Sequence, residues 1–303
     1  MKALVFVALM ATTFMVFAVD RSYAAHHKLR AFSSYDDAFK AMIDAVRADD
    51  EKELFALFGP EGKDLFPLRG GTEGEARERF VKAYDEKHRI ETRGVNKAVL
   101  RVGKNDWPWP VPVVKVSGHW RFDVNEGKAE VLARRIGKNE VSAVQVSLAY
   151  VDSQHEYGDQ HQAKGMMEYA QQLASDPGKK NGLCWETKKG ETPSLLGPHL
   201  AAACMSGTKA GAGVTPYHGY FYKILTKQGT NAPGGAYDYV VNGKMIGGFG
   251  LIAYPAVYGS FGITTFIVNQ QGVVYQKDLG PNTEKAAEAM TAFDPDETWK
   301  KVD

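Results

Sequence analysis

The stretch between Tyr217 and Gly280 constrains the fold of this chain more than any other part. Aromatic and β-branched residues recur there in short runs, and glycine, asparagine or proline ends each run. This pattern is typical of several short antiparallel strands joined by tight turns. We interpret the stretch as the sheet of a scaffold that packs on a helix around residues 141–151.

The amino-acid composition indicates a globular protein with no strong electrostatic field of either sign. The 303 residues suit two domains of ordinary size, and a hydrophobic content of 44% is that of a folded chain. Lys and Arg number 37 against 36 Asp and Glu, so the total charge does not favour nucleic acid or an anionic membrane. We therefore expect no nucleic-acid partner.

The N-terminus has the pattern of an export signal. Lys2 supplies the positive start, residues 3–19 form an apolar core, and Ser22-Tyr23-Ala24 is a small-x-small cleavage site. We expect cleavage after Ala24, with Ala25 as the next choice. A permanent anchor helix is the alternative, although an apolar run of about seventeen residues is short for a bilayer. The prediction is a periplasmic protein with signal peptide 1–24 and no stable membrane span after cleavage.

The chain has two cysteines, Cys184 and Cys204. In an oxidising periplasm an isolated pair within twenty residues most simply forms a disulfide, and such a loop closure stabilises a fold by about 3 kcal/mol. Two buried free thiols are the alternative. The spacing matches neither a C-x-x-C redox motif nor a haem attachment site.

Residues 25–137 are expected to form a first domain of α+β class. Ser34 begins a capping box, a second short helix ends at Gly59, and Thr72 opens a third. After Gly94 the spacing of apolar residues changes from the period of a helix to the two-residue period of a strand. This predicts strands at 98–102, 113–116, 119–124 and 128–136. Helices followed by a curved antiparallel meander give a helix-backed sheet.

The segment Trp120-Arg-Phe-Asp123, followed by a glycine turn and a predicted strand, resembles the nuclear-transport-factor-2-like fold. That fold is a helix-backed cone whose mouth often holds small molecules, so the resemblance implies a ligand pocket in the first domain. Fold alone does not fix function. The candidate residues of the pocket wall or mouth are Tyr84, Trp107, Trp109, Trp120 and Asp123.

Residues 138–303 are expected to form a second domain, with a long helix packed on an antiparallel sheet. Val141, Val144, Leu148 and Val151 share one face of the predicted helix. A further helix is predicted from Met166 to Leu173. A long loop follows to residue 216, with one short helix near 199–204. A last helix begins at Asn282 or Thr283 and carries Phe293 on its apolar face.

The helix segment Val144–Tyr157 and the strand segment Ile263–Tyr275 resemble pilin and pseudopilin globular domains. Pilins begin with a hydrophobic assembly helix directly before this unit, whereas about 100 residues of a predicted soluble domain precede it here. The resemblance therefore implies a pilin-like fold without implying polymerisation by the pilin route.

The whole mature chain is similar to a bacterial family of exported proteins known as domain of unknown function 2950. The matching segments are Tyr217-His-Gly-Tyr-Phe-Tyr222, Gly248-Phe-Gly-Leu-Ile-Ala-Tyr-Pro255, Thr265-Phe-Ile-Val-Asn269, Asp278-Leu-Gly280 and Ala292-Phe-Asp-Pro295. The resemblance implies a periplasmic location and no assigned activity.

The histidines do not form a recognisable catalytic or metal motif. His155 and His161 are six residues apart, which places them on nearly opposite faces of a helix, whereas zinc binding from one face needs i, i+4 spacing. His218 is predicted on a strand beside aromatic residues, where a structural role is favoured over general-base chemistry. Residues 243–250 contain glycines without the strand-then-helix context of a phosphate loop.

The predicted mature terminus offers one metal chemistry. If cleavage follows Ala24, then Ala25, His26 and His27 begin the chain, and a free amine, two amide nitrogens and an imidazole can surround Cu(II) in a square plane. Cleavage after Ala25 would remove this motif. No other cofactor is predicted.

Two functional hypotheses follow. The first is a non-enzymatic binding or envelope-assembly module, which works with another exported envelope protein. The alternative is a small-molecule-binding protein, or a modest hydrolase or isomerase, that uses the cone of the first domain. No catalytic residues are predicted for either.

Overall fold

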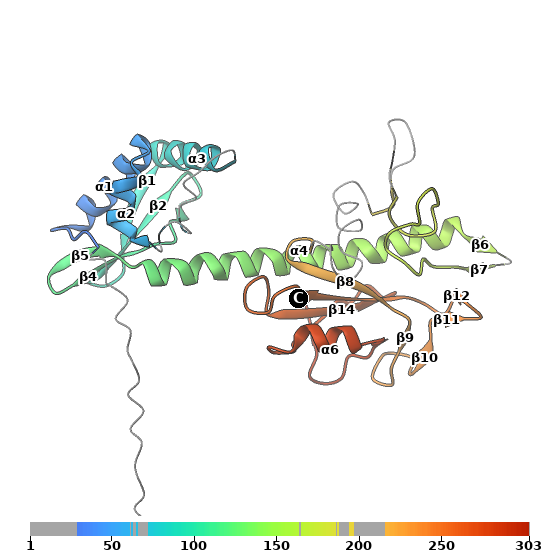
Figure 1. Cartoon of the computed structure of the whole chain (residues 1–303). Coiled ribbons are helices and arrows are strands. Elements are labelled where there is room, and N and C mark those ends of the chain that lie inside the picture. The colour runs from blue at the N-terminus through green and yellow to red at the C-terminus, as the bar shows by residue number, and fades with distance from the viewer. Residues whose placement is uncertain are drawn as a thin grey trace, which may run out of the picture. The chain divides into compact units, whose positions relative to one another are not determined.

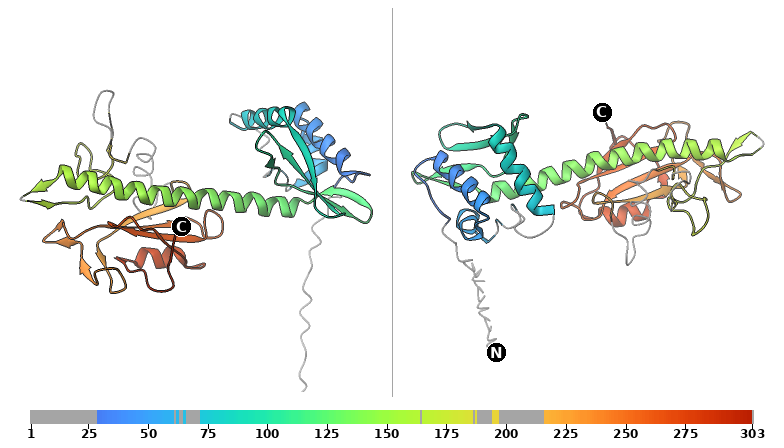
Figure 2. Two further views of the ribbon diagram at one scale, coloured as in Figure 1. Left: turned by 180° about the vertical axis from the view of Figure 1, so that it is seen from behind. Right: turned by 90° about the horizontal axis from the view of Figure 1, so that it is seen from above.

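A computed structural model describes residues 29–302 except 61, 63–64, 66–71, 164, 186, 188–193 and 197–215. The chain divides between Glu126 and Gly127 into two compact units, called unit 1 and unit 2 below. Helices and antiparallel sheets occur in both units, so the predicted α+β class is confirmed. Figures 1 and 2 show the elements of each unit.

The described part of unit 1 has three helices and one five-stranded antiparallel sheet. The sheet runs in the order β1-β2-β4-β5, and β3 pairs with β2. The elements are α1 (Tyr35–Ala48), α2 (Glu51–Phe58), α3 (Thr72–Glu86), β1 (His88–Thr92), β2 (Lys97–Val102), β3 (Trp107–Pro108), β4 (Val113–Val116) and β5 (His119–Phe122).

Local capping sets where α1 and α2 begin. The Ser34 side chain accepts a hydrogen bond from Asp37 N, and Asp50 accepts from the first turn of α2. Helix α1 ends where Asp49 takes a left-handed conformation with φ 52°. These ends match the helices predicted from the sequence.

The helices of unit 1 cover one face of its sheet (Figure 1). Phe122 on β5 lies between Phe39 of α1 and Phe58 of α2, at ring-centroid distances of 5.8 and 4.6 Å. All three rings are buried. In the described part of unit 1, aromatic side chains therefore fill the middle of the space between helices and sheet.

Unit 2 contains most of the long helix α4 and a five-stranded antiparallel sheet in the order β17-β15-β14-β13-β8. Its main elements are α4 (Val124–Gln160), β8 (Tyr220–Leu225), β13 (Gly250–Pro255), β14 (Thr264–Asn269), β15 (Tyr275–Asp278), α6 (Thr283–Ala289) and β17 (Lys300–Lys301). The short strands are β6 (Gln162–Ala163), β7 (Met166–Met167), β9 (Lys227–Gln228), β10 (Tyr237–Asp238), β11 (Val240–Val241), β12 (Lys244–Met245) and β16 (Ala292–Phe293). The antiparallel strands predicted between Tyr217 and Gly280 are confirmed.

The sheet of unit 2 is covered on both faces (Figure 2). Helix α4 covers one face, where Tyr150 packs edge-on against Phe249 at 5.6 Å. Helix α6 and β16 lie on the other face, around Ile252 and Phe293. Every residue of the central strand β13 is buried. This explains why β13 has an unbroken apolar sequence and not an alternating one.

The predicted strand at 128–136 is wrong, because these residues belong to α4. The side chain of Asp123 accepts a hydrogen bond from Glu126 N at 3.0 Å and so caps the helix at its start. The sequence from Lys128 to Ile136 is also rich in alanine, glutamate, leucine and arginine, which favour helix. Gly127 suggested a turn but lies inside the first turns of α4.

The predicted apolar face of α4 is only partly correct. Val151 is buried and Val144 packs against the core. Val141 is 60% exposed and Leu148 is 41% exposed, whereas Val146 and Tyr150 are buried in their place. Four polar residues of α4 are also buried: Asn139, Ser147, Ser153 and Gln154. All four are hydrogen-bonded, which permits their burial, and they interrupt the apolar period that the prediction used.

Three local predictions in unit 2 need correction. The predicted helix from Met166 to Leu173 is instead extended, with β7 at its start and a bridge between Tyr169 and Met245. The last helix ends at Ala289, so Phe293 lies on β16. His218 lies in a turn with φ 47°, before β8 begins at Tyr220. The helix predicted near 199–204 lies outside the described residues.

Candidate functional site

Unit 1 carries an open hollow beside Trp107 and Trp109, with a volume of about 780 Å³. It lies between α3 and the turn that joins β2 to β3. The centroid of the Trp109 ring lies 4.6 Å from that of Phe80 on α3 and 6.3 Å from that of Trp107. Trp109 is buried, whereas Trp107 is 45% exposed. The hollow therefore has an aromatic wall with one accessible indole ring.

Charged side chains border the same hollow. Lys104 Nζ and Glu86 Oε1 form an ion pair at 2.6 Å, and Arg79 and Asn105 complete the polar border. The hydrogen bond from Lys104 to Glu86 raises the pKa of the lysine above its ordinary value. Lys104 is therefore a cationic donor at neutral pH, not a general base.

The other predicted pocket residues lie elsewhere in unit 1. Tyr84 stacks on His88 with ring centroids 3.8 Å apart. Trp120 packs edge-on against Tyr35 at 5.1 Å. Asp123 caps α4. Of the five candidates, the structure thus brings Trp107 and Trp109 together at one hollow, and the remaining three make separate contacts.

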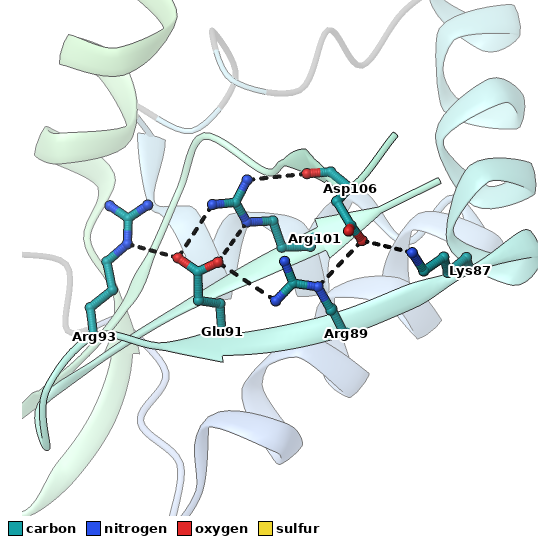
Figure 3. Close-up of polar contacts among 6 residues, drawn as sticks. All are labelled: Lys87, Arg89, Glu91, Arg93, Arg101 and Asp106. Atoms are coloured by element: carbon teal, nitrogen blue, oxygen red, sulfur yellow. Dashed lines mark hydrogen bonds and ion pairs between the residues drawn. The ribbon is translucent and has the colours of Figure 1, made fainter. Parts of the chain in front are cut away.

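A second feature of unit 1 is a charged network on the face of the sheet that points away from the helices (Figure 3). Glu91 accepts hydrogen bonds from Arg101 Nε at 3.0 Å and from Arg101 Nη2 at 3.3 Å. Arg93 Nε donates to the same carboxylate at 3.2 Å, and Arg89 Nη1 lies 3.6 Å from it. Three guanidinium groups, from β1, from β2 and from Arg93 directly after β1, therefore surround one carboxylate.

The network continues to the turn before β3. Asp106 Oδ1 lies 3.3 Å from Arg89 Nε and 3.2 Å from Lys87 Nζ, and the Asp106 carbonyl oxygen accepts from Arg101 at 3.1 Å (Figure 3). The hydrogen bonds from Arg101 and then Arg93 hold the pKa of Glu91 below its ordinary value. The hydrogen bond from Lys87 does the same for the pKa of Asp106. Four cations thus face two ionised carboxylates.

A comparison with models of protein families shows which family the chain matches. A family model described as a protein of unknown function, DUF2950, matches residues 29–302. The chain belongs to the DUF2950 family. The match covers both units. A search of curated proteins found no match, and a search of solved structures also found none.

Sequence reasoning missed the charged network of this DUF2950 protein because the total charge is close to zero. The charges are segregated along the chain: residues 87–122 contain eight lysines and arginines but two acidic residues, Glu91 and Asp106. A count over the predicted sheet alone would have revealed this excess. The opposite bias in the preceding helices conceals it in the sum.

The remaining candidates of the DUF2950 chain are structural or lie outside the described residues. His155 Nε2 lies 3.2 Å from Gln270 O, and the His161 ring stacks on Tyr157 at 3.9 Å. Cys184 is buried in the core of unit 2. The described residues contain no group of three or more His, Cys, Asp or Glu that could hold a metal ion. Ala25, His26, His27 and Cys204 are not among the described residues.

No described helix is both long enough and apolar enough to cross a membrane.

Proposed function

We propose that this DUF2950 protein is exported to the periplasm and acts there as a non-enzymatic binding module of the cell envelope. The observation that carries the proposal is the hollow of about 780 Å³ with the 45% exposed Trp107 on its wall. Ligand sites are concave and mostly apolar, with a few polar groups that orient the ligand. Trp107 and Trp109 supply the apolar wall, and Lys104 and Asn105 supply polar groups.

The chemistry of the hollow favours binding over catalysis. Its lysine is held in the cationic form by Glu86, and an ion pair of this kind donates hydrogen bonds without accepting a proton at neutral pH. The favoured ligand is a small molecule with one flat apolar face for the indole ring and polar substituents at its edge. The predicted partner, another exported envelope protein, stays part of the proposal.

The resemblances noted in the sequence also belong to this proposal. The helix-backed sheet of unit 1 supports a likeness to the nuclear-transport-factor-2-like fold, and α4 on an antiparallel sheet supports a pilin-like unit 2. A disulfide between Cys184 and Cys204 would tie Cys204 to the core of unit 2, where Cys184 is buried.

Export is tested by N-terminal sequencing of the protein recovered from the periplasm. The expected first residue is Ala25, which follows the predicted cleavage site. Retention of residues 1–24 on a cytoplasmic protein would overturn the proposed location. A start at any residue other than Ala25 would also end the proposal of a copper site at Ala25, His26 and His27.

Binding in the hollow is tested by native mass spectrometry of protein recovered from the periplasm without denaturation. We expect a bound small molecule on the wild-type protein and its loss from Trp107→Ala. Tyr237→Ala removes another exposed aromatic ring, 39% exposed in unit 2, and is expected to retain the molecule. Wild-type protein without any bound molecule, whose tryptophan fluorescence also does not respond to the periplasmic small-molecule fraction, would overturn the proposal.

A further inference from the structure

The charged network of Figure 3 lies on a strand at the edge of the unit 1 sheet. Strand β1 pairs with β2 along one side, and no other described strand pairs with it. Arg93 N donates to Lys97 O, and Gly103 N donates to Lys87 O. Because alternate residues of an antiparallel strand face the same neighbour, the odd-numbered residues of β1 bond to β2.

The even-numbered residues of β1 therefore direct their main-chain groups away from β2. Ile90 and Thr92 have N–H and C=O groups on this outer edge, and no described main-chain group bonds to them there. An exposed edge of this kind can accept an extended segment of another chain by strand addition. Thr92 is an exposed residue and Ile90 is half-buried.

The side chains of β1, and of Arg93 directly after it, decide which segment could pair there. Arg89 and Arg93 are about half exposed, with side-chain exposures of 46% and 52%. Among the described residues, the terminal amino groups of Arg93 and the Nη2 of Arg89 have no hydrogen-bond partner. One guanidinium group would suffice to pair Glu91, and Arg101 already contacts it with two nitrogens. The four cations of the network therefore exceed its two carboxylates by two positive charges.

We propose that β1 is a docking edge for an extended acidic peptide segment of an exported partner protein. A strand added beside β1 would place every second side chain on the same face as Arg89, Glu91 and Arg93. Acidic side chains opposite Arg89 and Arg93 would complete the charge balance of the network. An uncharged side chain is needed opposite Glu91, because like charges directly opposite one another destabilise a sheet.

The peptide that β1 would recognise therefore has five successive residues of defined type: an acidic residue, any residue, an uncharged polar residue, any residue, and a second acidic residue. The simpler interpretation of these arginines is a charged edge that prevents non-specific pairing. That role needs charge but no particular partner, whereas the proposed role needs both the charge and the free main-chain groups. This surface is distinct from the Trp107 hollow, so the two proposals can fail independently.

The test uses the full mature chain and the fluorescently labelled peptide Ser-Glu-Val-Thr-Val-Glu-Ser, with binding followed by fluorescence polarisation at low salt. Two control peptides are used: one with glutamine in place of both glutamates, and one of the same charge with both glutamates at its N-terminus. We expect the test peptide to bind at least about fivefold more tightly than either control, since each opposite-charge pair in register adds to the main-chain pairing.

Three variants separate strand addition from charge attraction. Arg93→Glu is expected to weaken binding at least about tenfold, whereas Lys285→Glu, an equal charge change at an exposed position of α6, is expected to change it less than about twofold. Thr92→Pro removes one outward-facing N–H without changing any charge, and we expect it to weaken binding at least about fivefold. Thermal unfolding of each variant checks that unit 1 remains folded.

Several outcomes would overturn the proposal. Equal binding of the two acidic peptides, or full binding by Thr92→Pro, would show attraction between charges without strand addition. Absence of any peptide binding at low salt would show that the arginines only protect the edge. If Thr92→Pro fails to fold, the comparison of the two acidic peptides on wild-type protein decides alone.

Discussion

Gln154 is the residue of unit 2 whose replacement tests the packing of α4 most directly. Its side chain is fully buried and makes three hydrogen bonds. Nε2 donates to Tyr150 Oη at 3.0 Å and to Ala170 O at 2.8 Å, and Oε1 accepts from Ala170 N at 2.8 Å. One side chain therefore satisfies both main-chain groups of Ala170, which is itself 1% exposed.

Replacing Gln154 by leucine puts a side chain of similar size at this position and removes all three hydrogen bonds. Tyr150 still donates to Gly250 O at 3.1 Å, so its hydroxyl keeps one partner. The N–H and C=O groups of Ala170 lose theirs, and each buried unsatisfied group costs about 1–3 kcal/mol. We expect the free energy of unfolding of unit 2 to fall by about 3 kcal/mol, which corresponds to a fall in Tm of roughly 6–12 °C.

The assay combines urea denaturation with hydrogen exchange. Exchange of the Ala170 amide should accelerate by about 100-fold in Gln154→Leu, because its only described hydrogen-bond acceptor is the Gln154 side chain. Gln145→Leu makes the same substitution at an exposed position of α4 and should change stability by less than about 0.5 kcal/mol. A loss below about 1 kcal/mol in Gln154→Leu, with the Ala170 amide still protected, would refute this account of the interface.

Three further predictions concern other parts of unit 2. Lys223 Nζ donates to Ala287 O and Glu288 O at 2.7 Å near the end of α6. Lys223→Met should therefore lower the free energy of unfolding, measured in urea, by about 1–2 kcal/mol. An equal loss in Lys227→Met, a control at an exposed position, would contradict this. Burial raises the pKa of Tyr254 to about 12, above the ordinary value of 10.0, so its contribution to stability is complete below pH 10 and is lost as the pH rises toward 12. Unfolding measured between pH 10 and 12 should therefore be less pH-dependent in Tyr254→Phe, and ionisation of Tyr254 near pH 10 in the folded protein, detected by absorbance, would exclude the effect. The proposed disulfide predicts that neither Cys184 nor Cys204 reacts with an alkylating reagent before reduction, in protein isolated from an oxidising compartment, and that reduction costs about 3 kcal/mol of stability. Alkylation of both cysteines in the unreduced, denatured protein would rule out the disulfide.

The sheet of unit 2 was predictable because its strands carry their own boundaries. Gly219 directly precedes β8, β13 ends at Pro255, and β14 ends at Asn269. Helix α1 was predictable for a similar reason, since Ser34 and Asp37 form a local cap that does not depend on the rest of the fold. Both signals are short-range, so a single sequence contains them completely.

The candidate site was predictable only in part. The aromatic residues Trp107 and Trp109 marked the hollow, but its other wall comes from Phe80 on α3, more than twenty residues earlier. The arginine face was hidden because Arg89 and Arg101 become neighbours only through the pairing of β1 with β2. Long-range contacts of this kind are set by register, which the amino-acid pattern of one strand does not specify.

Polar side chains of α4 hydrogen-bond to other elements of unit 2 at several points along the helix. Along one helix, Asn139 donates to Phe261 O, Glu140 accepts from Ile263 N and Thr264 N, and Tyr150 donates to Gly250 O. Gln154 then bonds to Ala170. Apolar contacts are non-directional, so they fix the position of α4 less sharply than hydrogen bonds do.

These directional bonds do not tolerate a slide of α4. A shift of about 5.4 Å, one helical turn, would separate each polar side chain from its partner and leave buried groups unsatisfied at several points along the helix. The polar side chains of α4 that bond to other elements therefore select one position of the helix. Two of them, Asn139 and Gln154, also interrupt the regular apolar pattern, so part of what misled the prediction makes the packing of unit 2 unique.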